Sequence, residues 1–404
     1  MDPSIPSALR EITTSGRELN RKGPLRGIHV IELAGMGPVP FCGMMLADMG
    51  ADVVRVDRVN ADSANLKTGG ILERGRRSVA INLKDEGGVD LVLEMASHAD
   101  VMMEGFRPGV VERLGLSPEQ CLERNPRLVY ARMTGWGQSG PLADSAGHDI
   151  NYIALAGVLA HIGRRGGAPV PPLNLVGDFG GGGMLLAVGI LSALMERTNS
   201  NQGQIIDAAM LDGAALLMAP FTGLLASGDF TLERGTNLVD SGAPFYDVYE
   251  CSDGEYVSVG ALEPEFYALL VERIGLVPSP SNDLRVRDNW EIAKVKFAEI
   301  FRMKTRAEWC KILEGTDACF APVLSLEEAP QHPQNQVRRV FQEFQGVIQP
   351  SPAPRFSRTP GSIQGPSPAP GADTREVLRE WLGHTHDEID ALLFAGVIGS
   401  SEPA

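Results

Sequence analysis

Residues 28–57 read IHVIELAGMGPVPFCGMMLADMGADVVRVD, and this stretch decides the fold. It holds two apolar runs rich in β-branched residues, 28–34 and 51–57, and an apolar segment at 40–49 between them that suits a helix. Strand, helix and strand in this order favour parallel strands joined by a crossover helix. The alternation continues with a helix at 88–98, a capping box at Ser117–Gln120 and further strands at 77–83, 100–106, 128–133 and 205–210. The sequence therefore predicts an α/β fold built on a doubly wound, mostly parallel sheet.

A second, smaller α+β unit is predicted after residue 244. Two alternating runs flank the turn Ser252-Asp253-Gly254 and predict a hairpin at 245–262. Residues 349–372 contain seven prolines, which is typical of a linker or an extended arm. We expect a flexible extension at 1–22, a large domain at 23–210, linker helices at 211–244, a small domain at 245–333, a return linker at 334–372, and a C-terminal segment at 373–398 that returns to the large domain.

The charge of the chain excludes one class of function. Among 404 residues there are 36 Lys and Arg against 51 Asp and Glu, a net charge of −15. A general nucleic-acid-binding protein would carry a basic footprint instead. Residues 1–135 are nearly balanced, with 17 basic and 18 acidic groups, whereas residues 136–404 carry 19 and 33. An anionic ligand is therefore expected to bind in the first third.

The five cysteines are scattered, without a CxxC pair, and this pattern favours a reducing compartment. Met1–Lys22 is polar and of mixed charge, unlike a signal peptide, and the last four residues match no sorting signal. We expect a cytoplasmic protein, with a peroxisome or mitochondrion open for a eukaryotic source. The apolar stretch Phe179–Met195 is short and glycine-rich for a membrane span, so we expect a buried helix there.

The first strand is followed by Gly35-Met36-Gly37, and Asp57 ends the second strand. This resembles a dinucleotide-binding fingerprint, but Pro40 replaces the third glycine, so a tight turn is favoured over a nicotinamide site. A set of basic residues accompanies these turns and could bind phosphates or be ordinary solvated surface: Arg55, Arg58, Arg74, Arg76, Arg77, Lys84, Arg107 and Arg113.

Three further positions could carry acid–base chemistry. His148 precedes an apolar helix, where the positive end of the helix dipole favours a neutral imidazole that can accept a proton; a simple capping role is the alternative. Asp178 precedes four glycines that permit close approach of a ligand or another backbone, and it could be a base, a nucleophile or a helix cap. Glu263 lies between a strand and a helix and could cap that helix or orient a histidine. A metal site at His384 and His386 is weakly indicated, since no further ligands have suitable spacing.

These landmarks resemble the family III CoA-transferases, the CaiB/BaiF superfamily, and within it most closely the α-methylacyl-CoA racemases. The resemblance covers residues 23–398 and rests on eight stretches: ELAGMGPVPF, GADVVRVDR, EGFRPGVVERLGL, ARMTGWGQSGPL, AGHDINYIALAG, PPLNLVGDFGGGG, GAPFYDVYECSDGEYVSVGALEPEFY and CFAPVLSLEEA. It implies a Rossmann-like large domain that binds CoA, a small domain, and an interlocked homodimer whose active site lies between domains of different subunits.

The resemblance also implies roles for particular residues. Transferase relatives use the aspartate that matches Asp178 as a nucleophile, whereas racemase relatives add the matches of His148 and Glu263. All three residues are present, so we expect a racemase that moves the α-proton of a 2-methylacyl-CoA between two bases, without metal or other cofactor. CoA transfer through an Asp178 acyl-enzyme is the alternative; a nicotinamide enzyme and a non-catalytic CoA-binding protein are disfavoured. Substrate or CoA binding is expected at Arg58, Arg76, Arg113, Gly147, Asp149 and Tyr152.

Overall fold

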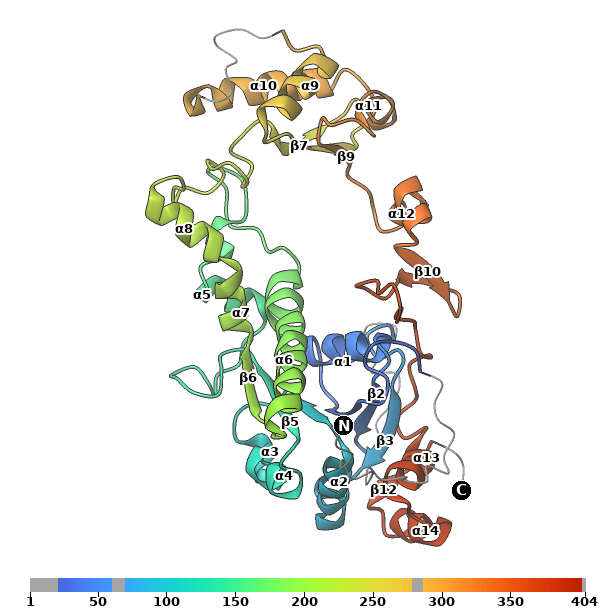
Figure 1. Ribbon diagram of the computed structural model, residues 1–404. Helices are drawn as coiled ribbons and strands as arrows, with labels where there is room; N and C mark the ends of the chain where they lie inside the picture. Colours follow the sequence, from blue (N-terminus) through green and yellow to red (C-terminus); the bar gives the residue numbers. More distant parts are fainter. Residues whose placement is uncertain (1–20, 60–69, 278–285, 402–404) are drawn as a thin grey trace, which may run out of the picture. The chain divides into compact units, whose positions relative to one another are not determined.

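The structure is a computed structural model that describes residues 21–59, 70–277 and 286–401. The described chain divides into two compact units (Figure 1). The first contains the described residues up to Thr134, together with Gly183–Ala208 and the described residues from Ser351 onward. The second contains Gly135–Gly182 and the described residues of Ala209–Pro350.

The first unit is built on a sheet with the strand order β12-β3-β2-β1-β4-β5-β6. Its strands are β1 (His29–Leu33), β2 (Asp52–Asp57), β3 (Arg77–Ile81), β4 (Val101–Glu104), β5 (Val129–Thr134), β6 (Ile205–Ala209) and β12 (Ile398–Gly399). The pairs β1–β2, β2–β3, β1–β4 and β4–β5 are parallel. The predicted doubly wound, mostly parallel sheet is therefore confirmed, and its order 3-2-1-4-5-6 is the Rossmann order.

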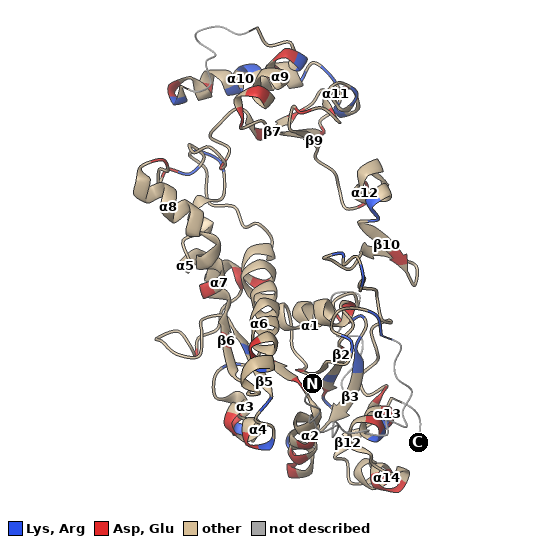
Figure 2. Ribbon diagram, viewed as in Figure 1, with Lys and Arg blue, Asp and Glu red and all other residues tan. Residues whose placement is uncertain are grey.

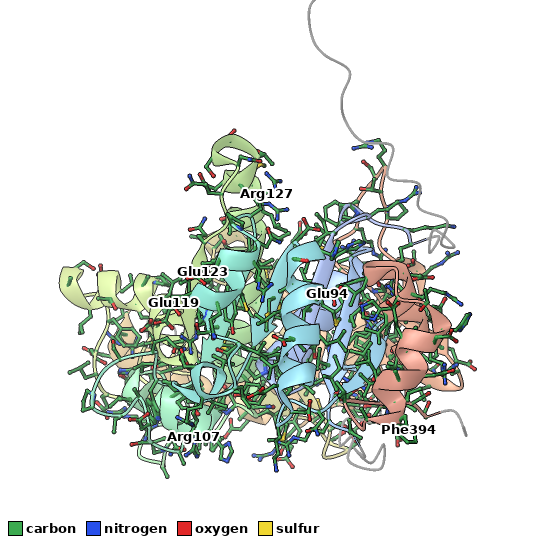
Figure 3. All side chains as sticks on the ribbon, turned by 90° about the horizontal axis from the view of Figure 1, so that it is seen from below. Glu94, Arg107, Glu119, Glu123, Arg127 and Phe394 are labelled. Carbon is green, nitrogen blue, oxygen red and sulfur yellow. The ribbon has the colours of Figure 1, made fainter. Side chains whose placement is uncertain are left out.

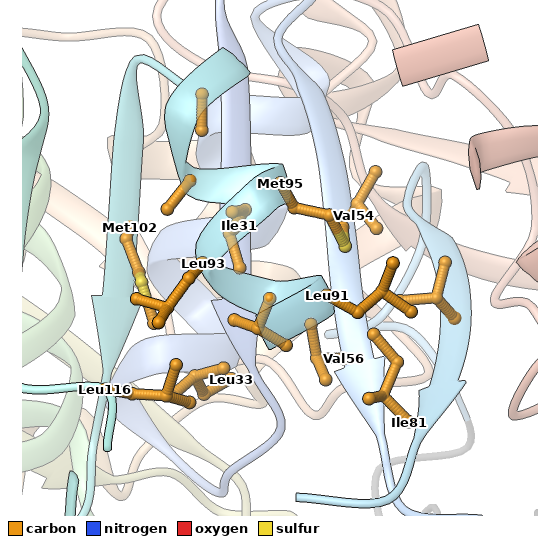
Figure 4. Close-up of a cluster of buried hydrophobic side chains, with 14 of the residues drawn as sticks. Ile31, Leu33, Val54, Val56, Ile81, Leu91, Leu93, Met95, Met102 and Leu116 are labelled. Carbon is orange, nitrogen blue, oxygen red and sulfur yellow. The ribbon is translucent and has the colours of Figure 1, made fainter. Parts of the chain in front are cut away.

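Helices cover the sheet, and every residue of β2 and β5 is buried. The helices of this unit are α1 (Pro38–Asp48), α2 (Glu86–His98), α3 (Val110–Arg113), α4 (Pro118–Arg124), α6 (Leu185–Ser200), α13 (Thr374–Val377), η7 (Leu378–Leu382) and α14 (His386–Phe394). Helix α2 packs Leu91 and Met95 over Ile31 and Val54 of the central strands (Figure 4). Figure 3 shows α2 beside α4, and Phe394 at the end of α14.

The C-terminal segment lies on the sheet of the first unit. Strand β12 pairs antiparallel with β3, and Val377, Leu378 and Trp381 join the same apolar cluster as the central strands. Residues 1–20 of the predicted extension lie outside the described residues. Arg21 is not loose, because it is 9% exposed and its guanidinium forms an ion pair with Asp52 at 3.2 Å.

The second unit begins with short helices around the predicted acid–base residues. They are α5 (Asp149–Leu155), η2 (Leu159–His161), the π-helix η3 (Leu175–Met184), α7 (Met210–Leu217) and α8 (Ala219–Ser227). The segment expected to form linker helices, 211–244, contains α8 and all but the first residue of α7, with a break at Met218, and α8 contains no buried residue. Proline at the start of α8 explains the break, since it cannot donate a helical hydrogen bond.

The small domain has its own sheet and core. Strands β7 (Tyr246–Glu250) and β8 (Tyr256–Gly260) form the predicted hairpin, and β9 (Phe320–Pro322) pairs antiparallel with β8. Three helices pack on this sheet: α9 (Pro264–Ile274), α10 (Trp290–Phe301) and α11 (Arg306–Leu313). The helix α12 (Pro333–Arg338) and a second hairpin, β10 (Phe341–Phe344) with β11 (Val347–Pro350), lie in the segment expected to be a linker.

Helix α6 differs from the buried helix that the sequence predicts. η3 runs directly into α6. By length and composition alone, the resulting 26-residue helix could cross a membrane, and 39% of its apolar 18-residue stretch is buried. Met184, Val188, Leu191 and Met195 are exposed at 51%, 59%, 36% and 71%. They recur at helical spacing and form a stripe, the α6 stripe. Figure 2 shows few charged residues along α6.

Candidate active site

In the first unit, exposed arginines follow the ends of two strands where the sheet changes direction. Strands β1 and β4 are neighbours, while β2 and β5 continue outward on either side, so the chain reverses its order between them. Ligands of open α/β sheets bind outside the carboxyl ends of strands at such a point. Arg58 directly follows β2, Arg107 follows β4, and both are exposed. Arg113 is also exposed, and its side chain folds back over Gly109.

Arg76 differs from these arginines because it is buried. Its Nε atom lies 2.5 Å from Oε2 of Glu32, and neither side chain has exposed area. Its other nitrogens donate hydrogen bonds to the carbonyls of Leu72 and Pro40. A guanidinium engaged in this way has no surface for a phosphate, so Arg76 links α1 to the sheet instead. Its predicted contact with CoA is corrected on this ground.

His148 in the second unit lies at the start of α5, as predicted. It is the N-cap residue, its imidazole is exposed, and its backbone N–H donates to Oδ1 of Asn151 at 3.1 Å. The carbonyl of the preceding Gly147 accepts a hydrogen bond from the Tyr152 hydroxyl. The Tyr152 ring in turn packs edge-on against Trp136, with centroids 4.7 Å apart. The loop that carries His148 is therefore held by buried aromatic contacts.

Asp178 lies in the first turn of η3, three residues inside the helix rather than at its cap. The capping carboxylate belongs to Asp149, whose Oδ2 accepts the backbone N–H groups of Gly177 at 2.6 Å and Asp178 at 2.8 Å. The Asp178 carboxylate accepts a hydrogen bond from Nδ2 of Asn174 at 3.0 Å. The structure thus brings together His148, Asp149 and Asp178, which lie 30 residues apart or less in the sequence.

The surroundings of Asp178 make its carboxylate a stronger base than a free aspartate. Burial raises the pKa of the Asp178 carboxyl, and the nearby negative charge of Asp149 raises it further. The hydrogen bond from Asn174 and the charge of a protonated His148 act in the opposite direction, and the net pKa shift is upward. A half-buried base of this kind suits proton abstraction from carbon.

Two of the predicted ligand-binding side chains face the protein. Asp149 is 5% exposed and Tyr152 is 7% exposed, and both make hydrogen bonds within the chain. A contact of the Gly147–Asp149 turn with a ligand would therefore use the backbone or the exposed imidazole. The carboxylate of Asp149 and the hydroxyl of Tyr152 hold the turn in place.

Glu263 lies apart from these groups in its bonding. It is the exposed N-cap residue of α9, and its side chain makes no capping hydrogen bond. Within residues 21–59, 70–277 and 286–401, no hydrogen bond or ion pair joins Glu263 to His148 or Asp178. A role in orienting His148 is therefore not fulfilled within the described part of one chain.

The structure also bears on the metal site and the dinucleotide-binding turn that the sequence raises. In the described part of the chain, no group of three or more His, Cys, Asp or Glu residues could hold a metal ion. His384 instead contacts Glu94 of α2, at 3.3 Å between Nε2 and Oε2. Glycine at position 37 has a φ of 70°, and Pro38 begins α1, so the Gly35–Gly37 segment forms the tight turn that the sequence favoured.

Together these features define an α/β protein with exposed arginines after two parallel strands and an acid–base pair at two helix starts. The sequence profile of CoA-transferase family III matches residues 25–374, and the chain belongs to this family. Alpha-methylacyl-CoA racemase of Mus musculus is 48% identical over 367 residues, covering 90% of this chain and 95% of the relative. Its counterpart in Homo sapiens is 45% identical over 384 residues, covering 94% and 98%.

A solved structure shows the same fold. A CaiB/BaiF family protein from Brucella suis superposes with a TM-score of 0.78 at 24% sequence identity, covering 89% of this chain and all of that chain. This likeness confirms the predicted fold, and the match to CoA-transferase family III confirms the predicted family.

Sequence reasoning missed two features of the site. Asn174 holds Asp178 from one helical turn earlier, and the spacing of four residues before an acidic side chain is a signal that could have identified it. The capping of η3 by Asp149 had no local signal, because the two partners lie 28 residues apart.

Proposed function

We propose that this chain is a racemase that interconverts the R and S epimers of 2-methylacyl-CoA thioesters, as its relatives' names indicate for those proteins. The observation that carries the proposal is the pairing of His148 with Asp178. An exposed imidazole and a half-buried carboxylate lie at adjacent helix starts that one buried carboxylate ties together. Two bases of different type near one point are what a proton transfer between two faces of a carbon requires.

In this mechanism one base removes the α-proton and the other returns a proton to the opposite face. The intermediate is an enolate, whose charge would be met by the backbone N–H of Asp149 at the start of α5. The bases exchange roles between the two directions, because the reverse reaction starts from the opposite protonation states. No chemical step requires a metal or another cofactor, because CoA is part of the substrate.

We further propose that exposed arginines of the first unit bind the CoA phosphates. Arg58 and Arg113 are the candidates with exposed guanidinium groups. Guanidinium groups suit phosphates because they donate two parallel hydrogen bonds.

We also propose that the protein works as a homodimer whose active site is shared between subunits. The α6 stripe supports an apolar contact with a second copy, since contiguous exposed apolar surface marks interaction sites. Glu263, which is exposed and has no link to His148 within the described part of its own chain, would be supplied by the partner. The five unpaired cysteines support our placement of the protein in a reducing compartment such as the cytoplasm.

The test is proton NMR of a single-epimer 2-methylacyl-CoA incubated with the protein in D2O. We expect the α-proton signal to disappear and both epimers to form without an acceptor acid. His148→Ala and Asp178→Asn should each abolish epimer formation, whereas Asp85→Asn, at a distant helix cap, should not. No exchange in D2O, but movement of CoA to an added carboxylate and a hydroxylamine-trapped acyl group on Asp178, would instead establish CoA transfer.

A further inference from the structure

Asp149 is the structural link between the two candidate bases. It follows His148 directly in the chain, and its Oδ2 atom is one hydrogen bond from the backbone of Asp178. The same atom accepts the N–H of Gly177, so a single carboxylate oxygen fixes two consecutive peptide groups of η3. Any displacement of this carboxylate would therefore alter the position of Asp178 relative to His148.

The contact between Asp149 and η3 permits only glycine at position 177. A Cβ atom there would lie 2.5 Å from Oδ2 of Asp149 and 2.9 Å from its Cγ. Real Cβ atoms do not approach other atoms so closely, so a side chain would push the carboxylate away. Gly177 is not held in a left-handed conformation, so its requirement arises from these contacts and from Cγ2 of Ile153, which would lie 3.2 Å from the added Cβ.

The Asp149 carboxylate also brings an incompletely compensated charge. Its second oxygen, Oδ1, is buried and has no hydrogen-bond partner among the described residues. Burial without a partner leaves the negative charge of this carboxylate poorly screened, and Asp178 is an ionisable group on which this charge acts. This charge makes the neighbouring Asp178 carboxylate hold a proton more tightly.

We propose that Asp149 is a positioning residue of the racemase reaction, which fixes the separation of His148 and Asp178 through its hydrogen bonds to the first turn of η3. The inference rests on the proposed function, in which His148 and Asp178 are the two bases. In this role the Asp149 side chain faces the protein and affects the reaction by holding Asp178 in place, without touching the substrate.

Three variants separate the position of this carboxylate from its charge. Asp149→Ala removes both hydrogen bonds, and we expect kcat for epimerisation to fall about 100-fold with KM little changed, as for a displacement of about 1 Å at a reacting group. Gly177→Ala should have the same effect, because its methyl group displaces the Asp149 carboxylate while leaving that side chain chemically unchanged. Asp149→Asn keeps an acceptor oxygen of the same shape, so it should retain much more activity than Asp149→Ala.

The pH profile of Asp149→Asn reports on the charge. Removing a negative neighbour lowers the pKa of the Asp178 carboxyl, so the acidic limb of kcat/KM should move to lower pH than in the wild type. His148, the other titratable group facing Asp178, is unchanged in this variant. Asp85→Asn and Asp85→Ala are matched controls at the N-cap of α2, where Asp85 accepts the N–H of Gly87 at 2.9 Å. Gly223→Ala is the glycine control, since its Cβ would meet nothing within 4 Å.

Hydrogen exchange followed by mass spectrometry tests the link without relying on activity. The peptide covering 175–184 should exchange faster in Asp149→Ala and Gly177→Ala than in the wild type, and at the wild-type rate in the controls. Unchanged exchange in this peptide, or wild-type kcat in Asp149→Ala, overturns the positioning role. An unshifted acidic limb in Asp149→Asn overturns the role of its charge. Absence of epimerisation by the wild type would overturn the proposed function instead, while the exchange data would still decide whether Asp149 holds Asp178.

Discussion

At the scale of single residues, the buried pair of Glu32 and Arg76 makes a strong prediction for stability. Arg76→Ala leaves the Glu32 carboxylate buried without its cation, which costs about 3–5 kcal/mol of unfolding free energy. Urea denaturation of the variant measures this loss. The double variant Glu32→Gln/Arg76→Met, which removes both charges, should be less destabilised than Arg76→Ala.

Arg58→Ala is the matched control for this pair. Its guanidinium is exposed, so unfolding free energy should change by no more than about 0.5 kcal/mol, while KM for the acyl-CoA rises if it binds phosphate. Normal stability of Arg76→Ala together with a raised KM would contradict the structural role of Arg76 and return it to the CoA site.

The pH dependence of proton exchange is a second prediction at this scale. The pKa of Asp178 is raised, by burial first and by Asp149 second, so the carboxyl is protonated at pH values where a free aspartate is already ionised. For the epimer whose proton Asp178 accepts, activity should therefore decline, on lowering the pH, before the ordinary aspartate pKa of about 3.9 is reached. The rate of α-proton exchange into D2O buffers of graded pH measures this limb. A limb at the ordinary aspartate value would contradict the raised pKa.

Local sequence signals predicted His148 and Asp178 as chemical residues, but not the depth or partners of a side chain. Arg76 belongs to a run of arginines that looks alike in the sequence, and only the packing of α1 against β1 buries it. Asp149 is expected from the sequence to bind the ligand, whereas its carboxylate bonds to a different helix through tertiary packing. Glu32 lies 44 residues from Arg76, and Gly177 lies 28 residues from Asp149, so no local pattern encodes these contacts.

At the scale of elements, η3 and α7 cross with their backbones in close approach. A Cβ atom on Gly213 would lie 1.9 Å from the carbonyl oxygen of Gly181. Gly213→Ala must therefore separate the two helices, and we expect a loss of about 1–3 kcal/mol in unfolding free energy and reduced epimerisation. Gly223→Ala in the next helix has open space and should stabilise the protein slightly, because alanine favours helix over glycine. Thermal and urea unfolding measure the stability of the two variants. Equal stability of Gly213→Ala and Gly223→Ala would contradict the close approach of η3 and α7.

The sequence predicted the long apolar strands and their helices well, because burial on both faces leaves continuous apolar runs. The four glycines after Asp178 correctly indicated the approach of another backbone, although Gly213 could not be identified as the partner. The short strands β9 and β12 were missed, since three or two residues carry no periodic signal. The π-helical geometry of η3 depends on its packing and had no sequence signature.

At the scale of the molecule, the first unit joins distant parts of the chain through buried charges. Asp52 at the start of β2 pairs with Arg21 and Arg77, and Arg77 also pairs with Glu380 at 2.6 Å. The indole of Trp381 donates to the same Asp52 carboxylate at 3.1 Å. The two arginines lower the pKa of Asp52 against the opposing effect of burial, which is the largest contribution. The return of the C-terminal segment is expected from the sequence, because its short helices could not bury their apolar faces alone. The charge network could not be predicted, because it joins residues that are far apart in the sequence.

The proposed sharing of the active site between two subunits leads to the last prediction, which uses two chains expected to be inactive. His148→Ala lacks one base and Glu263→Gln lacks the group proposed to orient it, so each homodimer should be strongly impaired. In a mixed dimer, the Glu263→Gln chain supplies His148 and Asp178, and the His148→Ala chain supplies Glu263, so one of two sites is intact. Dimers co-expressed with two affinity tags and purified on both should recover about half of the wild-type activity.

The control is a mixed dimer of His148→Ala and Asp178→Asn. Asp149 holds both bases within one chain, so this mixture contains no intact pair and should remain inactive. Activity in the control, or none in the first mixture, would show that the site is assembled differently.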